Sequence, residues 1–320
     1  MYKRQLLAGA LAALRQAAQA AAASDRRLTA VFLGDYIDRG PASRGVIEDL
    51  IAFEAEAACE TIFLRGNHEQ VLLDVARGTD PGHGWLKHGG FATLESYGAA
   101  LPPRGPRGDL QAVVRAAAPA SHLNFLNRTK LMARFGDYLF AHAGLRPDRL
   151  IQEQSPADLL WFRYYDDETP LHSATVVHGH SPNPLPILGR HRIAIDTRAY
   201  ATGALTLLRL EGTRKAFERV VIARETLKPT LEPWTELDSA YRTGPRVRGT
   251  QGRWETDELE APARRSRGLI AAAVIVLAAA AAVIAFLSAA PVAQRPNAVA
   301  SESAPRSAAE PDPAGRSRDG

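Results

Sequence analysis

The stretch GDYIDRG (residues 34–40) directly follows LTAVFL (residues 28–33), a short apolar run rich in β-forming residues, and it precedes a segment with helical character. Two carboxylates, Asp35 and Asp38, and the guanidinium of Arg39 are therefore expected on a loop at the carboxyl end of a buried strand. Open α/β sheets bind their ligands at this edge. Carboxylates can hold a metal cation and a guanidinium can bind phosphate oxygens, although Asp and Gly also form ordinary turns.

A second unit of the same kind follows along the chain. Residues 41–59 have an apolar helical face, and TIFL (residues 61–64) is a short apolar run that ends in RGNHE (residues 65–69). Two strand–helix units with polar loops at one edge predict an α/β fold with helices packed on a sheet. Upstream, residues 6–23 have the spacing of an amphipathic helix. Residues 70–127, with their Gly- and Pro-rich pieces, predict a helical insert that partly covers the site.

Strand-like segments resume in the second half of the chain, at residues 132–135, 138–141, 174–177, 192–197 and 203–210. The first two flank Gly136-Asp137, which is a two-residue hairpin signal. His142 follows the second segment directly and His180 lies shortly after the third, so both imidazoles are expected at strand ends. We expect the globular domain to span residues 6–225.

The amino-acid composition limits the classes of protein to which the chain can belong. The chain has 320 residues, of which 46% are hydrophobic and 23% charged, so it can bury the core of one large domain or two average ones. A net charge of +4 is small for this length and does not indicate nucleic-acid binding. A single cysteine, Cys59, excludes an internal disulfide framework.

The C-terminal part differs in composition from the rest. Residues 226–267 are polar, rich in Pro, Gly and charge, and are expected to form a linker. Residues 268–290 carry no charge and are long enough to span a bilayer, with a buried Ala-rich helix as the alternative. Because arginines precede this run, we expect a single-pass bacterial inner-membrane protein whose large domain lies in the cytoplasm. Residues 291–320 are expected to be a disordered tail.

The strand-end loops together carry a set of oxygen and imidazole groups. Singly, each group has an ordinary explanation as a turn or strand-end residue. Together they predict a site for Mn, Fe or Zn rather than for Ca, since imidazole nitrogens accompany the oxygens. The set consists of Asp35, Asp38, Asn67, His68, His142 and His180.

These loops resemble the motifs of the calcineurin-like metallophosphoesterases, in the family's order: GDYIDRG, RGNHE, HAG (residues 142–144) and GHSP (residues 179–182). WFR (residues 161–163) and IDT (residues 195–197) resemble further landmarks of the branch that contains bacterial serine/threonine protein phosphatases and diadenosine-tetraphosphatases. The resemblance covers roughly residues 6–215. It implies a two-sheet αββα sandwich and the hydrolysis of phosphoproteins or dinucleoside polyphosphates.

The resemblance also implies a cofactor, namely two divalent metal ions, Mn before Fe or Zn. Asp35 would bridge the two ions, and the shell of the second ion would be completed by Asn67, His142 and His180. A water between two such ions becomes a hydroxide that attacks phosphorus.

The other site residues are assigned by the same resemblance. His68, oriented by Asp38, would protonate the leaving oxygen. Arg39, Arg65 and Arg163 would bind the phosphate oxygens, for which a guanidinium fork is well suited.

Two departures from the family pattern stand out. The first motif, Gly-Asp-x-His-Gly, is expected before the first helix, yet the chain starts MYKRQ. A transposase sequencing adapter encodes these residues after a GTG start, so we interpret the start as a gene-fragment artefact. We expect a sandwich that lacks its first strand and an incomplete first-metal site; a membrane-anchored, non-catalytic phosphate-binding pseudo-phosphatase is the alternative. At Arg198, where the family usually has Gly, a guanidinium could bind phosphate or obstruct the site.

Overall fold

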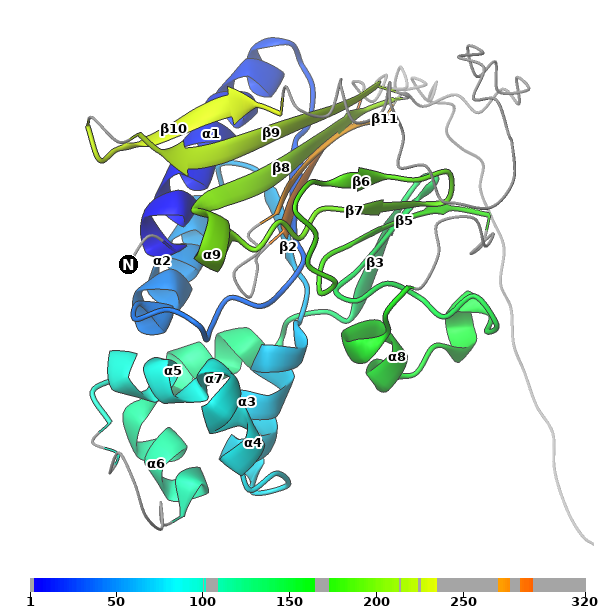
Figure 1. Cartoon of the computed structure of the whole chain (residues 1–320). Helices are drawn as coiled ribbons and strands as arrows, with labels where there is room; N and C mark the ends of the chain where they lie inside the picture. Colours follow the sequence, from blue (N-terminus) through cyan, green and yellow to red (C-terminus); the bar gives the residue numbers. More distant parts are fainter. Residues whose placement is uncertain are drawn as a thin grey trace, which may run out of the picture.

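The computed structural model describes residues 3–99, 101, 109–164, 173–212, 214–223, 226–234, 270–276 and 283–289. Within these residues two β-sheets pack face to face, and helices lie on their outer sides (Figure 1). A mixed α/β fold is therefore confirmed.

The larger sheet has the strand order β10-β9-β8-β11-β12-β1-β2 in the described residues. Its strands are β1 (Thr29–Phe32), β2 (Glu60–Phe63), β8 (Ala204–Glu211), β9 (Arg214–Ile222), β10 (Pro229–Pro233), β11 (Ile270–Val276) and β12 (Val283–Ala289). β1 and β2 are parallel, with Thr29 opposite Glu60. Their carboxyl ends therefore meet at one edge and bring the GDYIDRG and RGNHE loops together.

The smaller sheet has the order β3-β4-β5-β7-β6 in the described residues. Its strands are β3 (Met132–Phe135), β4 (Tyr138–Ala141), β5 (Thr175–His178), β6 (Ile187–Leu188) and β7 (Arg192–Ala194). The predicted hairpin is confirmed, with Met132 opposite Ala141 and Phe135 opposite Tyr138. β4, β5 and β7 are parallel, so the loops that carry His142 and His180 leave the sheet at the same edge.

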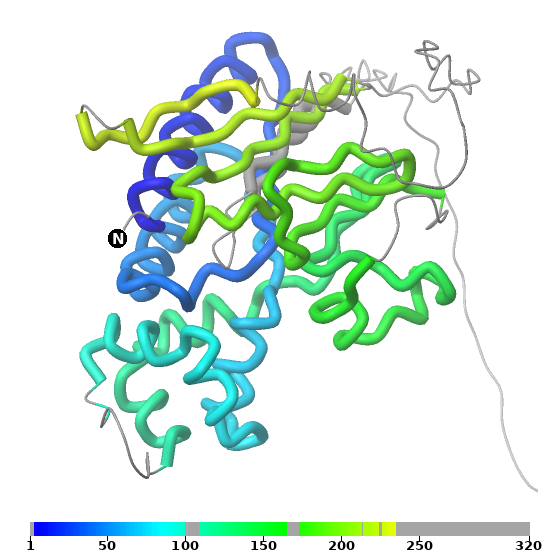
Figure 2. Tube along the Cα trace, in the orientation of Figure 1, coloured from blue at the N-terminus to red at the C-terminus, as the bar shows by residue number. Residues whose placement is uncertain are grey.

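The longer helices near the N-terminus pack on the larger sheet, and the insert helices gather at one end of the molecule (Figure 1). The helices are α1 (Lys3–Ala23), α2 (Ser43–Glu56), α3 (Asn67–Arg77), α4 (His83–Trp85), η1 (Leu86–Gly90), α5 (Phe91–Ser96), α6 (Leu110–Ala117), α7 (Ala120–Asn127), η2 (Ile151–Glu153), α8 (Pro156–Trp161) and α9 (Ala199–Thr202). In Figure 2, α1 in blue lies beside the yellow-green strands from the other end of the domain. A Cβ atom on Gly9 would lie 2.6 Å from Pro229, so glycine permits this close packing.

Strand β1 shows how the two layers of the core are separated. Ala30 and Phe32 belong to the apolar cluster under the helices, whereas Val31 and Leu33 pack between the two sheets. Successive side chains of a strand point to opposite faces, so an uninterrupted apolar run is required where both faces are buried. The run LTAVFL (residues 28–33) satisfies this requirement.

The prediction of a transmembrane helix at residues 268–290 is wrong. Residues 270–276 and 283–289 are strands β11 and β12, which pair with β8 and β1. In the parts of the chain that the structure describes, no helix is long and apolar enough to cross a membrane. The predicted membrane anchor, the inner-membrane location and the orientation depended on that helix and are wrong with it. A continuous apolar run has no periodicity that separates a helix from a buried strand, and this one contains several β-branched residues.

Among the described residues no strand precedes α1, and the position beside β1 is taken by β12 from the C-terminal part of the chain. β1 is paired on both sides, with β2 and with β12, so the sheet has no open edge there. The segment predicted as a linker (residues 226–267) begins with β10, which pairs with β9. The rest of that segment, from residue 235, and the predicted tail (residues 291–320) lie outside the described residues.

Candidate metal centre

The GDYIDRG loop has an unusual backbone where it leaves β1. Asp35, Asp38 and Arg39 have φ values of 60°, 67° and 55°, in the left-handed region that non-glycine residues rarely adopt. A Cβ atom on Gly34 would lie 2.4 Å from the backbone nitrogen of Gly66, so only glycine lets the two loops approach this closely. Strained backbone that the surrounding structure enforces is concentrated at functional sites.

Glu69 holds the two loops together. Its carboxylate accepts hydrogen bonds from the backbone nitrogens of Asp35 (2.6 Å), Gly66 (2.9 Å) and Ile37 (3.1 Å). The side chain is fully buried, and burial together with the nearby Asp35 raises the pKa of Glu69 to about 7, against the effect of these N–H donors. Glu69 was not among the predicted site residues, although a Glu at the third position of a helix is a known capping signal.

Replacing Glu69 by Gln tests this role. The amide nitrogen of Gln would face a backbone N–H, leaving at least one buried donor without an acceptor, which costs about 1–3 kcal/mol. We expect the free energy of unfolding in urea to fall by roughly that amount. Glu56→Gln is the matched control because Glu56 pairs with Arg15 on the surface. Equal urea midpoints for the two variants would contradict the assignment.

Four predicted ligands converge between the loops. The Oδ1 atom of Asn67 lies 3.0 Å from Nε2 of His142 and 3.0 Å from Nδ1 of His180. Oδ1 of Asp35 lies 3.3 Å from Nε2 of His142. Among the described residues, the donor atoms of Asp35, His142 and His180 all lie within 4.8 Å of one another, and all three side chains are buried.

The hydrogen bonds of His142 fix its tautomer. Its Nδ1 lies 2.8 Å from the carbonyl oxygen of Leu33, which can only accept, so Nδ1 carries the hydrogen. Nε2 is then a lone pair directed at the oxygens of Asn67 and Asp35. An imidazole oriented by a carbonyl in this way is the usual form of a metal-ligating histidine.

The charge states of the cluster also fit a cation. Burial lowers the pKa of His142 and, together with His142, lowers that of His180 to about 3, so both rings are neutral. Burial alone would raise the pKa of Asp35, but the positive charge that protonated His142, His68 and His180 carry, together with the ammonium of Lys3, lowers it to about 2. Nε2 of His180 is buried and has no hydrogen-bond partner in the described part of the chain. The cluster thus gathers a carboxylate, an amide oxygen and two neutral imidazoles, a donor set that fits a divalent transition metal.

An Asp–His pair lies beside this cluster. Nδ1 of His68 is 2.5 Å from Oδ2 of Asp38, and Asp38 is fully buried. Burial by itself would lower the pKa of His68, but the carboxylates of Asp35 and Asp38 outweigh it and raise that pKa. Because the ring is held through Nδ1, its Nε2 is the nitrogen that can exchange a proton with a substrate.

The three predicted phosphate-binding arginines have different surroundings. Arg39 and Arg163 are exposed; Arg39 lies over the Tyr200 ring at 5.2 Å, and Nη1 of Arg163 lies 3.5 Å from the carbonyl oxygen of His180. The half-buried Arg65 instead donates to the carbonyl oxygen of Asn127 (2.7 Å) and to Gln70 and Thr129. Arg39 and Arg163 therefore lie at the exposed rim of the metal-ligand cluster, whereas Arg65 points toward the end of α7.

Arg198 begins α9 with φ 56°, in the left-handed region where glycine is least strained. Its backbone nitrogen donates to Oδ1 of Asp196 (3.0 Å). Burial raises the pKa of Asp196 to about 6, and Arg39 and Arg198 oppose this effect. The backbone of Arg198 thus has a conformation that glycine adopts more easily. The guanidinium of Arg198 lies on the same side of the site as that of Arg39, since both act on Asp196.

The His142 loop rests on the half-buried ring of Tyr164, which was not among the predicted site residues. The hydroxyl of Tyr164 bonds both backbone groups of Leu145, and a Cβ atom on Gly144 would lie 2.4 Å from the Tyr164 ring. Tyr164 also packs against His178, which accepts a hydrogen bond from Arg192 (3.1 Å). Burial lowers the pKa of His178 to about 4, so it stays neutral and supports the loop without a charge.

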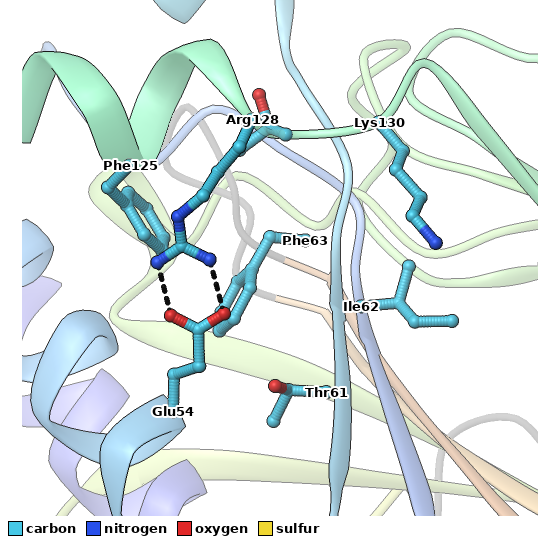
Figure 3. Close-up of a pocket in the computed structure, with 8 residues that line it drawn as sticks. Glu54, Thr61, Ile62, Phe63, Phe125, Arg128 and Lys130 are labelled. Carbon is cyan, nitrogen blue, oxygen red and sulfur yellow. Dashed lines mark hydrogen bonds and ion pairs between the residues drawn. The ribbon is translucent and has the colours of Figure 1, made fainter.

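A hollow elsewhere on the molecule contains none of the predicted site residues (Figure 3). It lies along β2, and Arg128 pairs there with Glu54 and lies over the Phe125 ring at 5.0 Å. Its lining residues are Glu54, Thr61, Ile62, Phe63, Phe125, Arg128, Thr129 and Lys130.

Neutral imidazoles together with oxygen ligands suit a divalent transition metal, and such an ion can make water a nucleophile in a hydrolase. Residues 7–216 match the model of the calcineurin-like phosphoesterases, and the chain belongs to this family. It is a hydrolase that acts on phosphate esters, and members of the family use divalent metals.

Two relatives illustrate the family. The chain is 30% identical over 197 residues to the bis(5'-nucleosyl)-tetraphosphatase PrpE (asymmetrical) of Geobacillus sp. (strain WCH70), a match that covers 56% of this chain and 74% of the relative. It is also similar to the crystal structure of a metallophosphoesterase from Sphaerobacter thermophilus, with 14% identity and a TM-score of 0.31 over 69% of this chain and 96% of the other.

Proposed function

We propose that the chain hydrolyses dinucleoside polyphosphates at a divalent-metal centre formed by Asp35, Asn67, His142 and His180. The observation that carries the proposal is the meeting of three acceptor atoms: His142 Nε2 lies 3.0 Å from Asn67 Oδ1 and 3.3 Å from Asp35 Oδ1. Such acceptors repel each other unless a cation lies between them. Mn, before Fe or Zn, is the ion that these four side chains would hold.

The side chains around the centre have distinct tasks in the proposed reaction. Bound divalent ions would supply positive charge to the phosphoryl oxygens and make water more acidic. Arg39 and Arg163 at the rim bind the remaining phosphate oxygens. As water adds to phosphorus and the bond to the leaving oxygen breaks, His68 gives its proton to that oxygen. Asp38 holds the His68 ring through Nδ1 and stabilises its cationic form.

Two exposed aromatic rings favour a nucleotide substrate. Trp161 is 50% exposed and its ring centre lies 6.0 Å from that of His180, while Tyr200 is 43% exposed and lies beneath Arg39. They come from α8 and α9, which are separate in Figure 1. An aromatic face next to an arginine binds a base by stacking, worth about 1–3 kcal/mol. Two exposed rings, Tyr200 beside Arg39 and Trp161 beside His180, match a ligand that carries two bases on one phosphate chain, which agrees with the name of the Geobacillus relative.

The substrate proposal is tested with diadenosine tetraphosphate and p-nitrophenyl phosphate in Mn²⁺. Trp161→Ala and Tyr200→Ala should each lower kcat/KM for the dinucleotide about 10-fold more than for the aryl phosphate, because each removes one stacking face. The matched controls Trp161→Phe and Tyr200→Phe keep an aromatic face and should retain most of the preference.

Other outcomes separate the competing functions. An equal loss on both substrates would contradict base stacking, and faster hydrolysis of a phosphoserine peptide than of the dinucleotide would indicate a protein phosphatase. Phosphate binding without hydrolysis of any of the three substrates would support the non-catalytic alternative.

A further inference from the structure

The carboxylate of Asp38 is held by the insert as well as by His68. The indole nitrogen of Trp85 donates to Oδ2 (2.7 Å), the same oxygen that faces Nδ1 of His68. The hydroxyl of Thr93 donates to Oδ1 (2.5 Å). Both carboxylate oxygens are thus occupied, and two of the three side-chain partners come from one segment, residues 83–96.

The backbone of Asp38 is fixed by the same segment. Its nitrogen donates to Oγ1 of Thr93 (2.9 Å) and to Oγ of Ser43 (3.0 Å), and these two hydroxyl oxygens lie 2.9 Å apart. Since the Thr93 hydrogen goes to Asp38, the Ser43 hydroxyl donates to Thr93. Trp85, Thr93, Ser43 and Asp38 are all buried, so every bond in this network is protected from water.

The shape of the insert lets it reach Asp38. Helix geometry breaks at His88 and at Gly89, which has φ 119°. A Cβ atom on Gly89 would lie 2.6 Å from the backbone nitrogen of Arg39, and one on Gly90 would lie 2.4 Å from the Trp85 ring. Two glycines therefore let the turn lie directly against the GDYIDRG loop, with the indole folded beneath it.

We propose that Trp85 and Thr93 are positioning residues for proton transfer. They fix the direction of the Asp38 carboxylate, and Asp38 in turn fixes the His68 ring so that Nε2 faces the leaving oxygen. In the step they support, the P–O bond breaks, its electron pair stays on the leaving oxygen, and the Nε2 proton of His68 moves to that oxygen. Water supplies the hydroxyl group that remains on phosphorus; the proton that it releases goes to solvent, and solvent protonates His68 again. The inference rests on the proposed role of His68 and assigns to the insert a part in the chemistry.

The test compares two aryl phosphates whose leaving oxygens differ in how strongly they need protonation. Phenyl phosphate has a basic leaving oxygen, whereas the p-nitrophenolate ion leaves readily without protonation. Trp85→Phe and Thr93→Val remove one donor each while keeping an aromatic ring or a branched side chain. We expect kcat for phenyl phosphate to fall at least about 10-fold, and the ratio of kcat for phenyl over p-nitrophenyl phosphate to fall at least about 5-fold.

Two control variants isolate positioning from packing. Thr93→Ser keeps the hydroxyl and should restore the ratio to within about 2-fold of the natural chain. Tyr97→Phe removes another buried hydroxyl of the same insert, one that bonds His122 and not Asp38, and it should leave the ratio unchanged.

An equal loss on both substrates in Trp85→Phe and Thr93→Val would overturn the inference, since it would show a purely structural role. If Trp85→Phe does not fold, the pair Thr93→Val and Thr93→Ser gives the same comparison. Failure of the unsubstituted chain to hydrolyse the two esters and diadenosine tetraphosphate would instead contradict the proposed function.

Discussion

His142→Ala should abolish tight metal binding and lower kcat/KM for p-nitrophenyl phosphate in Mn²⁺ by about 1,000-fold or more. The substitution removes the Nε2 lone pair that faces both Asn67 and Asp35. It leaves two oxygens and one imidazole, and because an incomplete shell binds a divalent ion weakly, affinity and activity should fall together.

Manganese affinity, measured by electron paramagnetic resonance of the free ion, checks the first half of this prediction, and initial rates check the second. His83→Ala is the matched control because His83 is exposed and lies outside the cluster. Retention of natural affinity in His142→Ala would contradict the assignment of His142 as a ligand.

His68→Asn should give a different result, with metal affinity close to that of the natural chain and kcat lowered by about 100- to 10,000-fold. An asparagine at this position can still bond Asp38 but cannot transfer a proton. The loss should be greater for phenyl phosphate than for p-nitrophenyl phosphate, because only the first needs a proton on its leaving oxygen.

This prediction is checked by measuring kcat and KM for both esters and the amount of manganese that the variant binds. KM should change little, since His68 acts on the leaving group and not on the binding of phosphate. A variant that loses metal and rate in parallel would show that His68 acts through the metal site. A variant with an unchanged kcat would remove His68 from the chemistry.

The sequence predicted the convergence of the ligands because strand polarity is a local property. An apolar run that ends in polar residues places those residues at the carboxyl edge of a sheet, and parallel pairing brings such edges together. For that reason Asp35, Asn67 and His142, which lie on three different loops, could be assigned to one site.

The contacts that orient the side chains around these residues could not be predicted. Trp85 bonds Asp38 across 47 residues, and Arg65 bonds Asn127 across 62, so no local pattern records either contact. The RGNHE motif predicted a functional loop. It could not show that Arg65 points toward α7, or that Glu69 accepts hydrogen bonds from the backbones of two loops. Such assignments depend on packing between elements, which periodicity does not report.

The prediction of a membrane helix from the apolar run at residues 268–290 was wrong for another reason, which concerns the run itself. Its length and lack of charge satisfy the requirements of a membrane helix and also those of two strands inside a sheet. The strands β11 and β12 pair with β8 and β1, and nothing within the run itself shows that these partners exist.

The central claim is that Asp35, Asn67, His142 and His180 hold a divalent metal. Crystals of the protein grown with manganese chloride, with diffraction recorded above and below the manganese absorption edge, test it directly. The account predicts an anomalous difference peak enclosed by these four side chains, within bonding reach of Asn67 Oδ1 and His142 Nε2. A map with no peak there, or with manganese bound only at other side chains, would contradict it.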